Sequence, residues 1–208
     1  MWTQPQELVI EKTGEVWNKL YGSYIKHGKR ISASAFTSYL ASPLQFFLKY
    51  VADIKEPPSI SQEFEMNKLG TVIHESMEEL LAPLKAVDDF IPTESLKAKL
   101  QIADQVVLKQ IGNEYLTSFN TVDELNSLQR IMHKIATEYV KMYLQYDIDQ
   151  YEAIRIVELE NSDDYILDFP IEINGSIETV SLYGIIDRVD EVLTKDGQTK
   201  LRIVDYKT

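Results

Sequence analysis

The spacing of apolar residues changes once along this chain, near Ala153. Before that point apolar side chains recur at intervals of three and four, which is typical of amphipathic helices, and after it they alternate in steps of two, which is typical of strands. Helices followed by strands, without a repeat, predict an α+β fold in which N-terminal helices pack on a C-terminal, mainly antiparallel sheet. We therefore expect a helical part over 1–150 and a sheet over 151–208.

Several helix ends are marked in the helical part. A helix is expected from about Lys68 to Ala82, because Pro83 would end it, and another from about Glu94 to Ile111. A later helix is predicted to begin in a capping box formed by Thr121 and Glu124. Its apolar stripe is expected to face the core and consists of Leu125, Leu128, Met132, Ile135, Tyr139, Met142 and Tyr146.

Strands are predicted over 154–160, 165–173, 177–189 and 199–207. Asn174-Gly175 predicts a tight hairpin, since both residues tolerate positive φ. Lys195-Asp196-Gly197 predicts a second hairpin with a three-residue loop and its glycine in the left-handed conformation. Together the strands would form an antiparallel meander.

The second hairpin sets the register of the last two strands. A three-residue loop pairs Thr194 with Gln198, and the same register places Asp187 opposite Asp205. Their Cβ atoms would lie about 5 Å apart, and alternation puts Lys207 on the same face. Two carboxylates at that distance repel by roughly 3 kcal/mol at an effective dielectric of 20, so a cation between them would stabilise the pair.

The same residues also allow an explanation without a metal. Asp187 could form a salt bridge with Lys207 or Arg202 while Asp205 is exposed at a strand end. A two-residue turn in the hairpin would instead put the two acids on opposite faces of the sheet. Spacing alone leaves these alternatives open.

Four strings in order give this chain a resemblance to a known family. Residues 183–190 (Tyr-Gly-Ile-Ile-Asp-Arg-Val-Asp) and 203–208 (Ile-Val-Asp-Tyr-Lys-Thr) resemble the second and third motifs of the PD-(D/E)xK nuclease superfamily. Gly70 and His74, four residues apart on a predicted helix, match the branch found in RecB and AddB, the nuclease domains of bacterial helicase-nucleases. An upstream string matches the same branch through Ser34, Tyr39, Ser42-Pro43 and Phe46.

The resemblance implies a restriction-endonuclease-like fold and a set of site residues. Asp187, Asp205 and Lys207 would be catalytic, with the lysine orienting or deprotonating the attacking water. His74, Asp187, Asp205 and the main-chain carbonyl of Tyr206 would be metal ligands. Carboxylate and carbonyl oxygens suit Mg²⁺, and the imidazole makes Mn²⁺ an alternative. In this family a helix and a strand follow the D-x-K motif, so the fold is expected to lack its last helix and strand here.

Composition limits the remaining possibilities. Cysteine is absent, and Ser42 stands where many members of this branch carry the first ligand of an iron-sulfur cluster, so no such cluster is expected. The formal charge of −12 argues against a broad basic face that coats nucleic acid. Lys26, Lys29 and Arg30 beside His27 form a local basic cluster, which is interpreted either as a solvated loop or as a local contact.

The resemblance thus implies a metal-dependent DNA nuclease, an exonuclease acting in double-strand-break repair and recombination. Single-stranded DNA ends would be its substrate, delivered by a helicase region or partner subunit of a larger protein. The chain contains neither a membrane-spanning run nor a signal-peptide pattern, which predicts a cytoplasmic location. The alternatives are a catalytically idle DNA-binding or scaffolding module with the same fold, and a helical adaptor capped by strands.

Overall fold

The computed structural model describes Glu11 and residues 14–54, 62–161 and 165–207. The chain forms two compact units, and each is discontinuous in sequence. Unit 1 comprises Met1–Pro58 and Ser162–Ile185, and unit 2 comprises Ser59–Asn161 and Ile186–Thr208. A helix does give way to a strand between Gln150 and Tyr151, but the compact units cut across that point.

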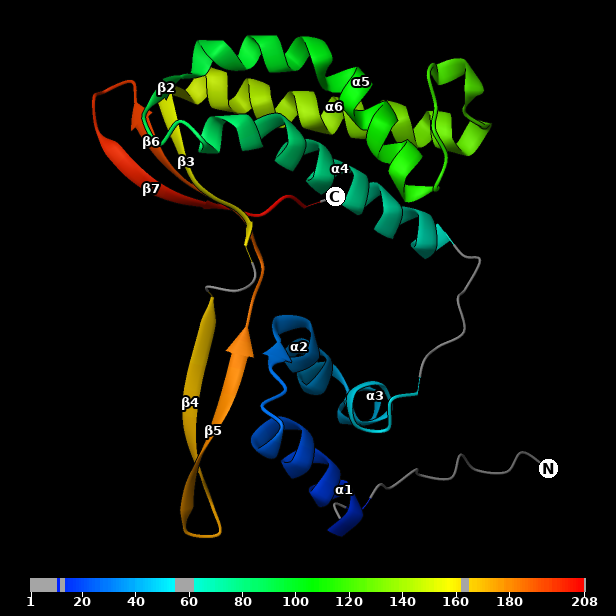
Figure 1. The fold of residues 1–208 in the computed structure, drawn as a ribbon, viewed down its shortest axis with the longest axis vertical. Coiled ribbons are helices and arrows are strands. Elements are labelled where there is room, and N and C mark those ends of the chain that lie inside the picture. The colour runs from blue at the N-terminus through cyan, green and yellow to red at the C-terminus, as the bar shows by residue number, and fades with distance from the viewer. Residues whose placement is uncertain (1–10, 12–13, 55–61, 162–164, 208) are drawn as a thin grey trace, which may run out of the picture. The chain divides into compact units, whose positions relative to one another are not determined.

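Long helices form one layer of unit 2 (Figure 1). They are α4 (Gln62–Lys85), α5 (Leu96–Glu114) and α6 (Ser127–Gln150), with the short η3 (Thr93–Ser95) and η4 (Val122–Glu124) preceding the latter two. Each fully buried aliphatic side chain contributes about 1.5–3 kcal/mol, so their shared core holds the helices together. That core includes Val72, Ile73, Leu80, Leu81, Val107, Ile111, Val140 and Leu144. Within the described residues, no helix combines the length and apolar content that a membrane span requires.

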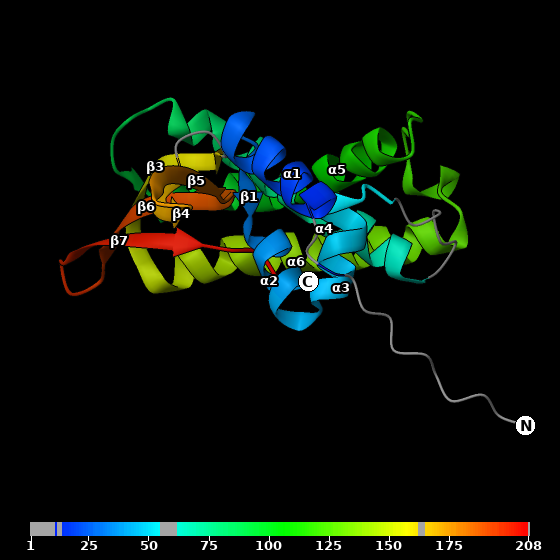
Figure 2. The ribbon, with the colours of Figure 1, turned by 90° about the horizontal axis from the view of Figure 1, so that it is seen from below.

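A four-stranded antiparallel sheet forms the other layer of unit 2, in the order β2-β3-β6-β7. Its strands β3, β6 and β7 can be followed in Figure 2. The strands are β2 (Ile91–Pro92), β3 (Tyr151–Asn161), β6 (Ile186–Thr194) and β7 (Thr199–Val204). Leu159, Val204 and Tyr206 join the helical core, so the helices cover one face of this sheet. Leu201 and Ile203 of β7 are exposed.

The predicted register between the last two strands is confirmed. The amide of Thr194 donates to the carbonyl of Gln198 at 2.9 Å, and Gly197 closes the three-residue loop with a φ of 81°. Arg188 pairs with Val204 at the far end of the ladder. Asp187 and Asp205 are therefore the next positions beyond the last pair.

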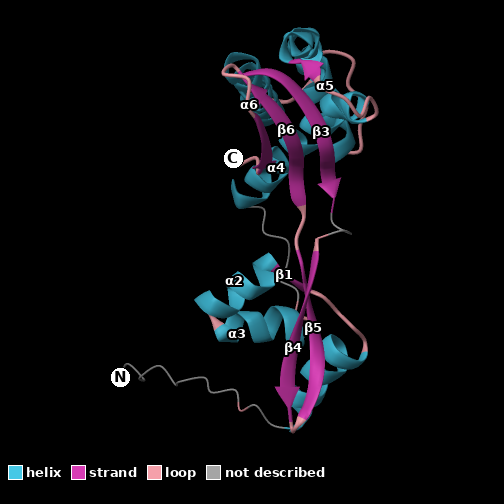
Figure 3. Cartoon of the chain, turned by 90° about the vertical axis from the view of Figure 1, so that its left-hand side faces the viewer, coloured by secondary structure: helices cyan, strands magenta, loops and turns pink. Residues whose placement is uncertain are grey.

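Unit 1 combines short helices with a three-stranded sheet, ordered β1-β5-β4 (Figure 3). Its helical elements are α1 (Gly14–Leu20), the π-helical η1 (Tyr21–Lys26), α2 (Ala33–Ala41), α3 (Pro43–Phe46) and the π-helical η2 (Phe47–Val51). Its strands are β1 (Ile31–Ser32), β4 (Ile166–Ile173) and β5 (Ser176–Tyr183), with β1 parallel to β5. The predicted Asn174-Gly175 hairpin is confirmed, with φ values of 51° and 80°.

The prediction of one strand over 177–189, and with it the simple meander, is wrong. The chain leaves the first ladder at Tyr183 and enters another at Ile186, so β5 pairs with β4 whereas β6 pairs with β3. An apolar run shows that a segment is extended, but it does not show where the segment changes partner. The hairpin of β4 and β5 is thus an insertion between two strands that pair with each other.

Two helix boundaries also differ from expectation. Helix α4 begins at Gln62 and continues through Pro83 to Lys85. Proline removes one hydrogen bond and disfavours the preceding turn, but near a helix end the packing of the neighbouring leucines offsets this loss. Helix α5 likewise runs past Gly112, where a Cβ atom would lie only 2.5 Å from the carbonyl oxygen of Thr117. This glycine permits a close backbone approach within the helix.

The predicted start of α6 was wrong, and its predicted buried stripe was right only for Leu125 and Met132, with Tyr139 packing against the core. Asn126 and Gln129 form the capping box, each side chain accepting from the other's amide, while Thr121 precedes η4. Residues four apart form the buried face, and four members of the predicted stripe are exposed. The helix carries apolar residues on two faces, and their periodicity does not show which face is buried. The buried face contains Met132, Ala136, Val140, Leu144 and Ile148, and the exposed residues are Leu128, Ile135, Met142 and Tyr146.

Candidate metal centre

Three elements of unit 2 bring potential metal ligands together. His74 comes from α4, Glu160 from the end of β3 and Asp187 from the start of β6. One ligand atom from each lies within 4.8 Å of the others. The Nδ1 atom of His74 is 3.2 Å from Oε1 of Glu160 and 3.6 Å from Oδ1 of Asp187. An imidazole and two carboxylates at these distances can hold a divalent cation.

Local structure explains how these residues reach one another. Ile73 and Met77 are buried in the helical core, so α4 is fixed on either side of His74. Strand β3 has a register shift between Ile156 and Glu158, and Glu160 has a left-handed φ of 45°. That conformation costs a non-glycine residue about 1–2 kcal/mol, so the surrounding structure must hold it. The irregular strand end redirects the Glu160 side chain towards His74.

The backbone of Tyr206 completes the cluster. Its amide donates to Oδ2 of Asp187 at 2.6 Å, and its carbonyl oxygen lies 3.0 Å from Nε2 of His74. The Tyr206 ring is buried and packs against the ring of Tyr143, with centroids 4.9 Å apart. A single buried residue thus places a carbonyl oxygen beside the imidazole and orients the aspartate.

Two carboxylates next to His74 dominate the electrostatics of the cluster. A hydrogen bond to Glu160 raises the pKa of His74 above its ordinary value. Burial raises the pKa of Asp187, because desolvation disfavours the carboxylate. A positive ion would stabilise the ionised aspartate. An imidazole nitrogen of His74 and the carboxylate oxygens of Glu160 and Asp187 form a donor set that fits Mg²⁺ or Mn²⁺.

Asp205 and Lys207 lie beside this cluster rather than within it. Both side chains are exposed, and the lysine Nζ is 2.7 Å from Oδ2 of Asp205. This hydrogen-bonded pairing raises the pKa of Lys207. The carbonyl of Lys207 accepts a hydrogen bond from the Tyr143 hydroxyl at 3.0 Å, which anchors the segment after β7 to α6. The structure therefore assembles His74, Asp187 and the Tyr206 carbonyl, and leaves Asp205 paired with Lys207.

Sequence reasoning did not identify Glu160 as a site residue. The available signal was the pair Glu158 and Glu160 at the end of a predicted strand, since acids at the edge of a core are usually paired or functional. Glu158 instead forms an ion pair with Lys85 at 2.8 Å. Only the tertiary contact with His74 distinguishes the two acids.

A cavity of about 560 Å³ opens beside His74 and Glu160. Gly70, Glu75 and Glu78 of α4 line it as well. Burial and neighbouring carboxylates raise the pKa of Glu75, and three glutamates line the cavity wall. Gly70 adds no side chain to the cavity one turn before His74. A space of this size with acidic walls can admit hydrated cations.

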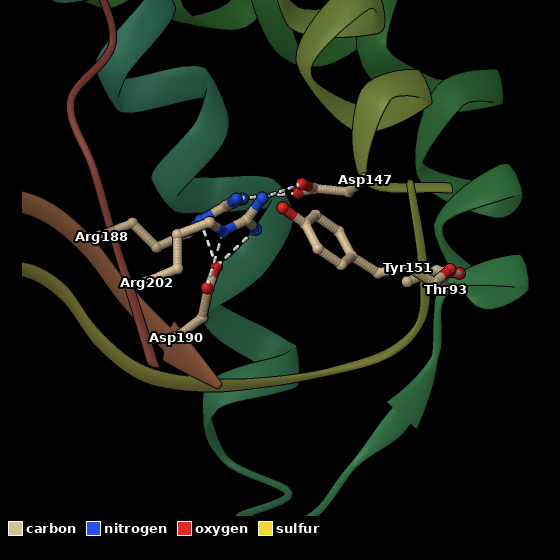
Figure 4. A network of polar contacts seen from close by, with 6 residues as sticks. All are labelled: Thr93, Asp147, Tyr151, Arg188, Asp190 and Arg202. Atoms are coloured by element: carbon tan, nitrogen blue, oxygen red, sulfur yellow. Dashed lines mark hydrogen bonds and ion pairs between the residues drawn. The ribbon is translucent and has the colours of Figure 1, made fainter. Parts of the chain in front are cut away.

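A buried ion network holds the sheet behind the cluster (Figure 4). Asp147 of α6 accepts from Arg188 of β6 and from Arg202 of β7, each at 2.8 Å. Asp190 forms ion pairs with the same two arginines, and each nitrogen–oxygen distance is 2.8 Å. The ring of Tyr151 lies 4.7 Å from the Arg202 guanidinium carbon. Because Arg188 directly follows Asp187, the network fixes the strand that carries the candidate ligand.

Comparison with known proteins identifies the family. The family model described as the PD-(D/E)XK nuclease superfamily matches residues 30–208. This chain belongs to that superfamily. Its nuclease domain is homologous to a subunit of the ATP-dependent helicase/deoxyribonuclease, and the α+β fold agrees with this membership. PD-(D/E)XK nucleases generally use divalent metals, and the His74, Glu160 and Asp187 cluster could hold such an ion.

Similar helicase/deoxyribonuclease subunits come from several bacteria. The one from Carboxydothermus hydrogenoformans is 29% identical over 186 residues, which is 86% of this chain and 16% of the relative. The one from Caldanaerobacter subterraneus is 29% identical over 206 residues, covering 91% of this chain and 16% of the relative. The one from Clostridium perfringens is 27% identical over 183 residues, covering 86% of this chain and 15% of the relative. The chain therefore spans about one sixth of the length of these relatives, 15–16%.

Proposed function

We propose that this chain is a metal-dependent deoxyribonuclease domain that hydrolyses DNA phosphodiesters. The single observation that carries the proposal is the convergence of His74, Glu160 and Asp187, with Asp205 and Lys207 in the segment that follows β7. The superfamily membership supports hydrolysis of a phosphodiester, and the name of the relatives supports DNA as the substrate.

The proposed ligands of the metal are His74, Asp187, Asp205 and the Tyr206 carbonyl, with Glu160 added from the structure. Mg²⁺ is the proposed ion and Mn²⁺ the alternative. Bound there, the cation would polarise the scissile phosphate and lower the pKa of a bound water. For Asp205 to act as a metal ligand, its ion pair with Lys207 must open.

Lys207 is proposed to act on the reacting groups directly. Its ammonium is exposed and only one residue beyond the carbonyl of Tyr206. It would orient the attacking water beside the phosphate and offset the negative charge that develops during displacement. Tyr143 supports this role by holding the Lys207 carbonyl.

The biological setting is also a proposal. We infer that the domain acts as an exonuclease on single-stranded DNA ends, in double-strand-break repair and recombination in the cytoplasm. A helicase region of a larger protein, or a partner subunit, would separate the strands. The relatives support this setting because their name joins helicase and deoxyribonuclease in one enzyme.

Metal binding and cleavage are tested separately. Thermal unfolding is followed while Mg²⁺ or Mn²⁺ is added, and a concentration of 100 Kd stabilises the folded state by about 2.7 kcal/mol. Asp187→Ala should abolish this shift, whereas Asp149→Ala, which removes an exposed carboxylate of α6, should retain it. An equal shift in all three proteins would contradict the metal centre.

Cleavage is measured with end-labelled single-stranded DNA in Mg²⁺. Lys207→Ala should reduce the rate by at least about 100-fold, the usual effect of losing one group that stabilises developing charge. The matched control is Lys200→Ala, an exposed lysine of β7 away from the cluster. Equal rates for Lys207→Ala and wild type would refute the catalytic role.

The alternative is a catalytically idle DNA-binding or scaffolding module. The closed ion pair between Asp205 and Lys207 favours it, because neither group is then available for catalysis. Metal-dependent stabilisation together with DNA binding, but without cleavage by wild type, would decide for this alternative.

A further inference from the structure

Residues 16–52 of unit 1, here called the basic segment, differ sharply in charge from the rest of the chain. They contain five Lys or Arg residues, eight aromatic residues and no Asp or Glu, whereas the whole chain has a formal charge of −12. A positive stretch in an acidic chain concentrates its field locally. This composition, cations interspersed with aromatic rings, is that of surfaces which bind single-stranded nucleic acid.

Four cations of the basic segment are exposed to solvent. Lys26, Lys29, Arg30 and Lys49 all have exposed side chains. Among the residues that the structure describes, no carboxylate forms an ion pair with any of these four, although Lys85 and Lys109 in unit 2 each pair with a glutamate at 2.8 Å. The basic segment therefore presents positive charge to solvent rather than using it to hold the fold.

Aromatic rings lie next to these cations. The Lys26 ammonium is 5.7 Å from the centroid of the Tyr21 ring, which in turn lies 6.0 Å from Trp17. In the second group, Lys49 is 5.3 Å from the Tyr50 ring, and Tyr50 stacks near Phe46 at 5.3 Å. Elements α1 and η2, which carry parts of the two groups, are in contact. The two groups thus belong to one packed region of unit 1.

Several rings of the basic segment remain open to solvent. Trp17 is 41% exposed, Phe36 51% and Tyr39 40%. A single exposed ring is ordinary on a protein surface, whereas several exposed rings within one segment are typical of an interaction surface. A nucleobase can stack on such a ring, and its phosphates can meet the lysines of the same segment.

We propose that the basic segment of unit 1 is a binding surface for single-stranded DNA. The inference rests on the proposed function, which supplies DNA as the substrate, and adds the residues that hold the strand. A single strand fits better than a duplex, because its unpaired bases are free to stack on Trp17, Phe36 and Tyr39. Lys26, Lys29 and Arg30 would contact its phosphates.

The charge contribution is tested by binding of the full chain to a fluorescent oligothymidylate, measured by anisotropy in EDTA so that no cleavage occurs. The triple variant Lys26→Ala/Lys29→Ala/Arg30→Ala should bind at least about tenfold more weakly, and the slope of log affinity against log salt should fall by about 2, since each single-strand phosphate contact contributes about 0.7. The matched control is Lys97→Ala/Lys134→Ala/Lys200→Ala, which removes three exposed lysines of unit 2. Equal losses in both triple variants would overturn the proposal in favour of a general charge effect.

The aromatic contribution is tested with Phe36→Leu and Trp17→Leu. Each should weaken binding to the single strand by about 5- to 150-fold, the effect of losing one stacked base, while far-ultraviolet circular dichroism remains unchanged. Leu128→Ala, which removes an exposed apolar side chain from unit 2, is the control and should leave binding unchanged. Two results together would overturn the single-strand assignment. Wild type would bind duplex and single strand equally tightly, and Phe36→Leu and Trp17→Leu would bind the single strand as tightly as wild type.

Failure of this inference is distinguishable from failure of the proposed function. Asp187→Ala should bind the oligothymidylate like wild type while losing metal-dependent cleavage. If the basic-segment variant binds and cleaves like wild type, the surface is wrongly assigned although the nuclease stands. If wild type binds polyglutamate but not DNA, the surface serves an acidic protein partner and the proposal is refuted.

Discussion

Replacing Asp147 by alanine removes a carboxylate that two guanidinium groups share in the interior of unit 2. The side chains of Asp147 and Arg188 are each 2% exposed, and that of Arg202 is 17% exposed. Removing one partner of a buried ion pair leaves an uncompensated charge and destabilises the fold by about 3–5 kcal/mol. Asp190 still contacts both arginines, so we expect the loss to lie near 3 kcal/mol rather than 5.

The loss is measured by urea unfolding followed by circular dichroism. The midpoint should fall while the m-value stays constant, because the surface exposed on unfolding does not change. For a chain of this length each kcal/mol lowers Tm by roughly 2–4 °C, so a loss of about 3 kcal/mol corresponds to a decrease of roughly 6–12 °C. Asp149→Ala removes the same charge from an exposed position two residues later and should stay within about 0.5 kcal/mol of wild type.

A double variant tests whether the loss of stability arises because Arg188 loses its partner Asp147. Asp147→Ala/Arg188→Met removes both charges of one buried pair, and apolar replacement of such a pair is often neutral. The double variant should therefore lose less unfolding free energy than the two single variants lose in total. The difference, which is the coupling energy of the pair, should be about 0.5–3 kcal/mol. Additive losses, or an Asp147→Ala protein as stable as Asp149→Ala, would refute the reasoning.

Two further perturbations test the close backbone approach and the added ligand. Gly112→Ala should destabilise the fold by about 1–3 kcal/mol, because its Cβ would lie 2.5 Å from the Thr117 carbonyl oxygen; an unchanged Tm would show that this contact relaxes freely. Glu160→Gln should weaken Mn²⁺ binding in calorimetric titration by at least about tenfold, because one negative oxygen beside His74 is lost. The control is Glu158→Gln, and equal Mn²⁺ affinities for the two variants would contradict a ligand role for Glu160.

Much of the fold was predictable because its signals are local. The order of helices before strands, the Asn174-Gly175 hairpin and the three-residue loop ending in Gly197 each depend on a few neighbouring residues. The loop in turn set the register of β6 and β7, since a hairpin fixes its own pairing. The family motifs likewise marked Asp187, Asp205 and Lys207 without any knowledge of the fold.

Only the tertiary structure decided the features that depend on distant segments. It selected the buried face of α6, because both faces of that helix are apolar, and it separated β5 from β6 through their different partners. It also placed Glu160, rather than Asp205, within reach of His74, 86 residues away in sequence. Glu160 makes that contact from the end of β3, where the strand has a register shift and Glu160 itself has a left-handed φ. Such backbone irregularities are held by surrounding packing and leave no periodic trace in the sequence.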